Sequence, residues 1–152
     1  MCALKLYDQY DRREAHDALS PGTPFYEQAG QWGMNGVVRI SKGANNFVFF
    51  VKLDGSSYYS AFQSISKEGI LKWLPPQNMG PDSPLIKTLI SHDYRKNAIH
   101  LFVKTKRTKK YIYLGPVVYK SYRVTRNSVL LFEWKILTWS LTKNLASLLD
   151  LD

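Results

Sequence analysis

Short runs of β-branched and aromatic residues, separated by turn residues, recur along most of the chain. Runs of this length and composition are typical of β-strands. No helical segment alternates with them, as it would in a βαβ fold. The strand candidates are residues 37–40, 47–53, 58–62, 70–74, 98–104, 110–114, 117–124 and 129–139.

Three segments instead have helical spacing or helix start and stop signals. They are residues 9–19, 84–91 and 141–149. The order helix, strands, helix, strands, helix predicts an α+β protein. We expect a small mixed or antiparallel β-barrel with about seven strands and three short peripheral helices. The 152 residues fit one domain, residues 1–152.

Glycine and proline mark where the chain is expected to turn. Residues 41–46 are expected to form a hairpin loop, and Gly115-Pro116 is expected to separate two strands. Residues 20–36 contain four Gly and two Pro and are expected to form a loop around Trp32. Because loops rarely expose a tryptophan, Trp32 either anchors this loop to the core or lines a binding site.

Positive charge is concentrated in one part of the chain. The net charge is +9, and residues 94–132 contain 10 basic residues and no acidic one. Aromatic residues make up 14% of the sequence. A basic surface with many aromatics is typical of proteins that bind single-stranded or flipped nucleotides. Basic proteins without this function are also common, and aromatics usually fill cores, so both interpretations stay open here.

The basic residues of this block are predicted to bind phosphate. They crowd the connection between two strand candidates and continue on the next strand, an arrangement that attracts a polyanion by releasing its counterions. The block contains no acid to neutralise them. Four tyrosines are interleaved, so a solvated sheet lined with tyrosines is the alternative. The predicted phosphate ligands are Lys104, Lys106, Arg107, Lys109, Lys110, Lys120 and Arg123, with Arg126 beside them.

Side chains that could support catalysis are few. Cys2 is the only cysteine, which excludes intrachain disulfides and cysteine-rich zinc sites. His16 is expected at the surface and His100 half-buried in a strand. His92 and Asp93 lie in a loop, where such a pair holds either a turn or a substrate. No metal site, cofactor or catalytic residue follows from these positions.

One pattern imitates a metal-dependent nuclease: Pro81-Asp82 followed by Glu133-Trp134-Lys135. Two carboxylates and a lysine can hold a divalent cation and stabilise an attacked phosphate. However, alternation along the strand puts Glu133 and Lys135 on its solvated face, and Asp82 is expected to be a helix cap. We therefore expect a binding module and not an enzyme.

The sequence predicts no association with membranes. No apolar run approaches the roughly 20 residues that span a bilayer. Acidic residues interrupt the first 19 residues, where a signal peptide would be continuously apolar. The cytoplasm is the expected location.

Segments spread over residues 10–139 resemble an SRA-like domain of unknown function found at the C-terminus of certain modification-dependent restriction helicases. The resemblance rests on the order and spacing of these segments taken together. They are Tyr10-Asp11-Arg12-Arg13-Glu14, Trp32, Gly36-Val37-Val38-Arg39-Ile40, Phe47-Val48-Phe49-Phe50-Val51, Leu71-Lys72-Trp73, Gln77, Asp82-Ser83-Pro84, Ile90-Ser91-His92, Leu101-Phe102-Val103 and Tyr111-Ile112-Tyr113-Leu114-Gly115.

The resemblance implies a PUA/SRA-type barrel that reads modified double-stranded DNA, typically 5-methylcytosine, by flipping the base into an aromatic cage. It also implies a role in restriction or defence, with a helicase or nuclease domain as partner. A PUA-like RNA-binding domain is the alternative function, and a nuclease is a weaker one.

Residues for such a base-binding site can be chosen from the matching stretches and the loops near them. Aromatic side chains would stack on the base, and polar ones would bind its edge. Phe50 is expected in the core, whereas Trp32 and Trp73 belong either to the core or to the cage. The predicted base-binding residues are Trp32, Tyr59, Trp73, Gln77, His92 and Asp93.

Overall fold

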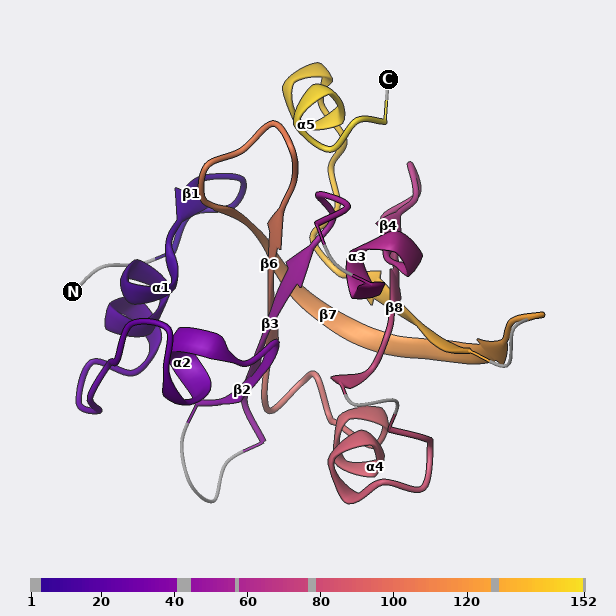
Figure 1. Ribbon diagram of the computed structural model, residues 1–152, viewed down its shortest axis with the longest axis horizontal. Helices are drawn as coiled ribbons and strands as arrows, with labels where there is room; N and C mark the ends of the chain where they lie inside the picture. Colours follow the sequence, from indigo (N-terminus) through magenta and orange to yellow (C-terminus); the bar gives the residue numbers. More distant parts are fainter. Residues whose placement is uncertain (1–3, 41–44, 57, 77–78, 127–128, 152) are drawn as a thin grey trace.

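A computed structural model describes residues 4–40, 45–56, 58–76, 79–126 and 129–151, apart from the side chains of Tyr58 and Tyr59 (Figure 1). In this described part of the chain, eight strands form one mixed sheet, and among its strand pairs only β3 and β6 run parallel. The strand order is β2 (Val37–Arg39), β3 (Phe47–Lys52), β6 (Ile99–Lys104), β7 (Tyr111–Val124), β8 (Leu130–Ile136), β5 (Ile70–Trp73) and β4 (Ser64–Ile65), and β1 (Gln9–Tyr10) pairs with β7.

The expected mixed sheet with short peripheral helices is confirmed. Within the described ranges the path of strand pairs is open, with β2 and β4 at its two ends, so the sheet does not close into a complete barrel. The predicted hairpin between the first two strands is confirmed by the antiparallel pairing of β2 and β3, although residues 41–44 of its loop lie outside the described residues.

β7 connects the two halves of the sheet. Its first residues pair with β6 and β1, and its later residues pair with β8. Leu101 lies opposite Gly115 while Phe102 lies opposite Tyr113, so Leu114 is the extra residue of a bulge. Gly115 has a φ of +85°, which glycine adopts without steric cost. Because a bulge bends a strand and increases its twist, a single strand can serve both halves.

The prediction of two strands separated by Gly115-Pro116 is therefore wrong. A glycine followed by a proline often ends a strand, but glycine in a strand also marks a bulge, and proline is tolerated there because a bulge already interrupts the hydrogen-bond ladder. A second irregularity lies between Tyr119 and Ser121, where Lys120 is the extra residue.

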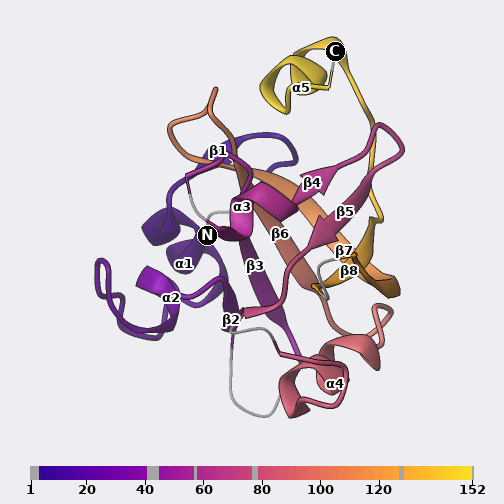
Figure 2. The ribbon, with the colours of Figure 1, turned by 45° about the vertical axis from the view of Figure 1, so that its right-hand side comes forward.

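Apolar clusters cover both faces of the sheet. Neighbouring residues of a strand point to opposite faces, so Phe49 enters the larger cluster and Phe50 the smaller one. Helices α4 (Pro84–Ile90) and α5 (Lys143–Leu148) contribute to the larger cluster. Helices α1 (Arg12–Leu19) and α2 (Gly30–Met34) cover the smaller one (Figures 1 and 2). Tyr111 and Tyr113 are buried in the smaller cluster, which removes the alternative of a tyrosine-lined solvated sheet at these positions.

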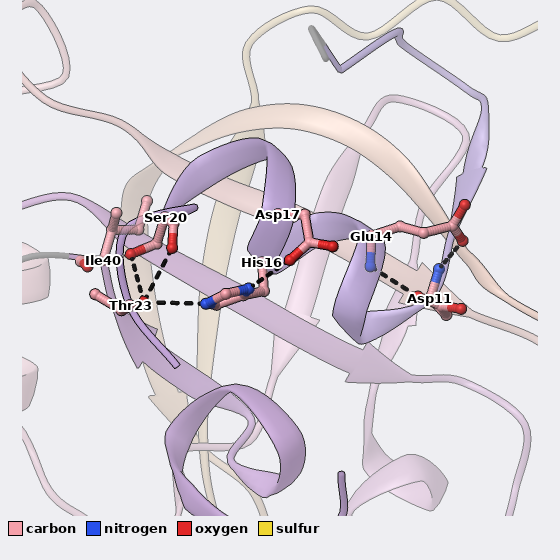
Figure 3. A network of polar contacts seen from close by, with 7 residues as sticks. All are labelled: Asp11, Glu14, His16, Asp17, Ser20, Thr23 and Ile40. Carbon is pink, nitrogen blue, oxygen red and sulfur yellow. Dashed lines mark hydrogen bonds and ion pairs between the residues drawn. The ribbon is translucent and has the colours of Figure 1, made fainter. Parts of the chain in front are cut away.

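The three predicted helices are confirmed, with small shifts at their ends. The carboxylate of Asp11 accepts the N–H of Glu14 at 2.8 Å, and the carboxylate of Glu14 accepts the N–H of Asp11 at 3.0 Å (Figure 3). This reciprocal capping fixes the start of α1. The hydroxyl of Thr142 accepts the N–H of Leu145 at 3.1 Å and caps α5 with this single bond.

Two helices and two strands differ from the expectation. α2 forms inside the predicted loop 20–36, and α3 (Tyr58–Phe62) replaces the strand predicted at 58–62. β4 was not predicted, and β1 takes the first two residues of the helix predicted at 9–19. The periodicity of a five-residue apolar run does not separate helix from strand, and a two-residue strand has no period at all. α2 depends on Gly33, since a Cβ there would overlap the carbonyl oxygen of Tyr26.

Replacing Gly115 by alanine should destabilise the fold. Besides the left-handed φ, a Cβ at this position would overlap the Thr138 hydroxyl and lie 2.9 Å from Leu6. We expect a loss of about 1–3 kcal/mol in the free energy of unfolding, measured by thermal or urea denaturation. Gly22→Ala is the matched control, because nothing lies within 4 Å of a Cβ there. Equal stability of the two variants would contradict the role given to the bulge.

Candidate nucleic-acid interface

Eight of the ten basic residues of the sequence block form two groups at opposite ends of β7, and the other two, Arg95 and Lys96, lie in the turn after α4 (Figure 1). β7 contains 14 residues. An extended strand of that length spans roughly 43 Å, at about 3.3 Å per residue. The eight residues are therefore divided between two surfaces in space. We name them the loop surface (Lys104, Lys106, Arg107, Lys109 and Lys110) and the ribbon surface (Lys120, Arg123 and Arg126).

The loop surface is held against α5. The hydroxyl of Thr105 donates to the carbonyl of Leu148 at 2.8 Å. The guanidinium of Arg107 donates to the carbonyl of Ser147 at 2.7 Å and lies 3.0 Å from the carboxylate of Asp150. Arg107 therefore has a structural role in docking α5, whatever else it binds.

Acidic residues from other segments partly neutralise both surfaces, which the block's own sequence does not reveal. The Lys110 ammonium lies 2.8 Å from the Glu14 carboxylate, and the Lys120 ammonium lies 3.9 Å from that of Glu133. The N–H of Asp11, followed by Lys110, lowers the pKa of Glu14. Exposed pairs of this kind contribute about 0–1 kcal/mol, so a phosphate group can compete for these cations.

Two lysines of the loop surface are exposed and have no ion pair within the described ranges: Lys106 and Lys109. The Lys104 ammonium lies 5.9 Å from the centre of the Tyr111 ring. The side chain of Lys106 passes beside Gly55, in the turn that leads from β3 to α3. The loop surface therefore borders the turn that leads into α3, the helix to which Tyr59 belongs.

A set of hydrogen bonds fixes this turn and the end of α3. The carboxylate of Asp54 accepts the N–H and the hydroxyl of Ser56, at 3.0 and 2.6 Å. Burial opposes the ionisation of Asp54, but these hydrogen bonds lower its pKa overall. The amide of Gln63 donates to the carbonyl of Lys52 at 3.2 Å and accepts the N–H of Leu74 at 3.3 Å. The sequence indicated Asp54 only as a turn residue and gave no signal for Gln63.

A separate hollow of about 320 Å³ lies at α2 and β2. Trp32 is 8% exposed and forms part of its wall. Arg12 fixes this wall, because its guanidinium donates to the carbonyls of Trp32 and Asn35 at 3.1 and 2.8 Å and stacks on Phe50 at 4.3 Å. The other lining side chains with polar groups are Thr23, Tyr26, Gln31 and Arg39.

The prediction that His16 lies at the surface is wrong. His16 is 3% exposed, and its ring lies 5.2 Å from that of Trp32. Its Nδ1 is 2.8 Å from the carboxylate of Asp17, and its Nε2 is 3.0 Å from the hydroxyl of Thr23 (Figure 3). Because the carboxylate can only accept, Nδ1 carries a proton. This network ties the loop after α1 to the helix and so positions one side of the hollow.

The two predicted cage tryptophans lie on opposite faces of the sheet. Trp32 contacts Phe50, whereas Trp73 stacks on Phe49 at 4.7 Å between ring centres. Trp73 is 3% exposed and makes T-shaped contacts with Trp134 and Phe132. Trp73 lies in the larger core cluster, while Trp32 and Phe50 lie in the smaller one, so the structure does not bring the two tryptophans together.

The other predicted base contacts are scattered or undescribed. The side chain of Tyr59 and all of Gln77 lie outside the described residues. His92 and Asp93 follow α4, where the carboxylate of Asp93 lies 3.2 Å from the guanidinium of Arg95. The ring nitrogens of His92 are buried without a hydrogen-bond partner among the described side chains, and burial lowers its pKa. The carbonyl of Asp93 accepts the N–H groups of Lys96 and Asn97, each at 3.0 Å, and so closes the turn that follows α4.

No group of three or more His, Cys, Asp or Glu residues that could hold a metal ion occurs in the described part of the chain. Glu133 is occupied by the hydroxyl of Ser121, at 3.0 Å, and by Lys120. None of the described helices is long and apolar enough to cross a membrane.

The architecture is that of an SRA domain. Crystal structures of the SUVH5 SRA domain are similar to this chain, one in complex with hemi-methylated CG DNA (TM-score 0.57, 13% identity, 92% of this chain and 93% of that chain covered). Two complexes with fully methylated CG DNA give TM-scores of 0.57 and 0.55, at 12% and 11% identity, each covering 91% of this chain and 93% of the other.

The chain belongs to the family described as domain of unknown function DUF3427, which it matches over residues 4–144. No curated protein matches its sequence. At these identities the SUVH5 structures establish the fold, and function has to be argued from the site.

Acid should destabilise the fold through His100. Burial lowers the pKa of His100 from 6.5 to about 4, and its Nδ1 shares a 2.8 Å hydrogen bond with the Tyr113 hydroxyl. Between pH 6.5 and about 4, His100 is therefore protonated in the unfolded chain but not in the folded chain. We expect up to about 3 kcal/mol of stability to be lost as the pH falls from 6.5 towards 4.

Urea denaturation at several pH values measures this loss. His100→Gln keeps a hydrogen-bonding side chain but cannot titrate, so its stability should depend less on pH in this interval. His92→Gln is a useful comparison, because burial also lowers the pKa of His92. Identical pH profiles for His100→Gln and the unaltered chain would contradict the prediction.

Proposed function

We propose that this chain is a DNA-binding module, and not an enzyme, that recognises a modified base in duplex DNA, with 5-methylcytosine as the first candidate. The observation that carries the proposal is the fold, shared over 92% of the chain with an SRA domain crystallised on hemi-methylated CG DNA. The exposed lysines of the loop surface support it. The proposal includes a cytoplasmic role in restriction or defence, with a helicase or nuclease domain as partner.

Base flipping is the proposed mode of recognition. Taking a base out of the stack costs a few kcal/mol, and stacking on an aromatic side chain returns about 1–3 kcal/mol. Burying the added methyl group contributes about 0.8 kcal/mol, which is only about fourfold in affinity. A larger preference requires a pocket whose shape excludes other groups.

We favour α3 and its preceding turn as the base-binding region. Here Lys106 of the loop surface lies beside Gly55, in the turn that leads into the helix that carries Tyr59. A base flipped at this place would leave its flanking phosphates near Lys104, Lys106 and Lys109. The hollow beside Trp32 is the second candidate, because Tyr26 and Arg39 offer a stacking face and a cation. Gln77, His92 and Asp93 stay predictions.

Reversing the charge of Lys106 and Lys109 together to glutamate should weaken binding to methylated and unmodified duplexes alike. Because two cations no longer bind phosphates, the slope of log K against log salt should fall by about 2. Fluorescence anisotropy over a salt series measures it. Arg107 is left unchanged because it docks α5.

Lys87→Glu combined with Lys96→Glu is the matched control. It makes the same change in charge on α4 and the turn after it, away from the loop surface (Figure 1). If both double variants weaken binding equally, the effect is one of net charge only, and the loop surface is not the phosphate-binding site.

Two tyrosine variants locate the base pocket. Tyr59→Ala should reduce the preference for methylated over unmodified duplex while the salt-dependent component of binding persists, since the lysines are unchanged. Tyr26→Ala, at the exposed edge of the hollow, should leave the preference intact. Competition binding measures both, with melting temperatures to verify folding. The reverse pattern would move the pocket to Trp32, and no change in either variant would exclude both places.

A further inference from the structure

The last part of β7 and the start of β8 form a two-stranded ribbon that projects from the body of the molecule (Figure 1). β6 pairs with β7 only up to Pro116, and β5 pairs with β8 only from Phe132 onward. Between these limits no other strand in the described ranges pairs with the ribbon. Its end is closed by Thr125, whose N–H donates to the carbonyl of Val129 at 2.8 Å.

One face of the ribbon is apolar and open to solvent. Tyr122 and Val124 share this face, because alternate residues of a strand point the same way. They are 45% and 61% exposed. The ring of Tyr122 stacks on Phe132 at 5.4 Å, so this face continues from the larger core cluster. Exposed apolar side chains that continue a core usually mark a contact surface.

The surroundings of this face are cationic. Arg123 and Arg126 are exposed, and they form no ion pair with the described residues. Lys120 faces Glu133 at 3.9 Å, and no acidic residue occurs between positions 94 and 132 of the sequence. An apolar face surrounded by cations suits a polyanion that also presents apolar groups.

We propose that the ribbon enters the major groove of duplex DNA, a role that rests on the proposed function and extends it. Two strands lie about 4.8 Å apart. The major groove, about 12 Å wide, admits a two-stranded ribbon in undistorted DNA, whereas the minor groove, about 6 Å wide, takes one only when the duplex is bent and the groove is opened. Arg123 and Arg126 then meet phosphates on the groove walls, and Val124 meets the methyl groups that thymine and 5-methylcytosine present there.

Site-directed crosslinking tests the groove directly. Val124→Cys, in a chain whose Cys2 is replaced by serine, is mixed with duplexes that carry a disulfide tether on a base edge in either groove. We expect crosslinking to the major-groove tether at least tenfold faster than to the minor-groove tether. Lys87→Cys on α4 is the control cysteine and should react slowly with both.

A second pair of variants does not depend on the new cysteine. Arg123→Ala with Arg126→Ala should lower the salt slope of DNA binding by about 1–2, because up to two cations that bind phosphate are removed. Melting temperatures verify that the variants are folded. If the slope is unchanged and Val124→Cys reacts no faster than Lys87→Cys, the inference is overturned, and the ribbon serves a protein partner.

The outcomes separate the two proposals. If the unaltered chain binds duplex DNA but the crosslinking and salt-slope experiments show no contact by the ribbon, only the groove contact is overturned. Absence of duplex binding by the unaltered chain overturns the proposed function, and with it the groove contact.

Discussion

β7 has to pair with β6 and β1 at its start and with β8 at its end, and both requirements depend on the bulge at Gly115. The left-handed φ of this glycine and the close approach of Thr138 leave no room for a side chain. The bulge turns the strand so that its first residues belong to the β2–β3–β6 half and its last residues to the β8–β5–β4 half. The loop surface and the ribbon surface lie at the two ends of this strand.

The same strand explains how charge and aromatic residues are distributed. Residues that are adjacent in the sequence block are divided between the loop surface and the ribbon surface because β7 separates them. Most aromatic side chains are occupied elsewhere: Phe49, Trp73 and Trp134 pack against one another inside the larger cluster. The high aromatic content is therefore mainly a property of the core, and the cations carry more of the functional argument than the aromatics do.

Much of the fold could be predicted from the sequence, because β3, β5, β6 and β8 are short segments rich in apolar, β-branched and aromatic residues between turn residues. The continuity of β7 could not, since glycine with proline signals a turn more often than a bulge. The site was harder to predict. The sequence predicts His16 at the surface because its neighbours along α1 are charged. In the structure Trp32 and Thr23, which follow α1 in the sequence, pack against its ring and bury it. Likewise Glu14 forms an ion pair with Lys110, and Asp150 forms one with Arg107. The partners of each pair are far apart in the sequence, so no local pattern predicts the pairing.

The central claim is that this SRA-type fold reads a modified base in double-stranded DNA. A competition experiment tests it most directly, with a methylated duplex, the same duplex without modification, and RNA of the same sequence competing for one labelled methylated duplex. The account predicts that methylated DNA competes best, by at least the roughly fourfold that a buried methyl group contributes, and that RNA competes worst. RNA that competes as well as methylated DNA, or equal competition by both duplexes, would contradict the claim.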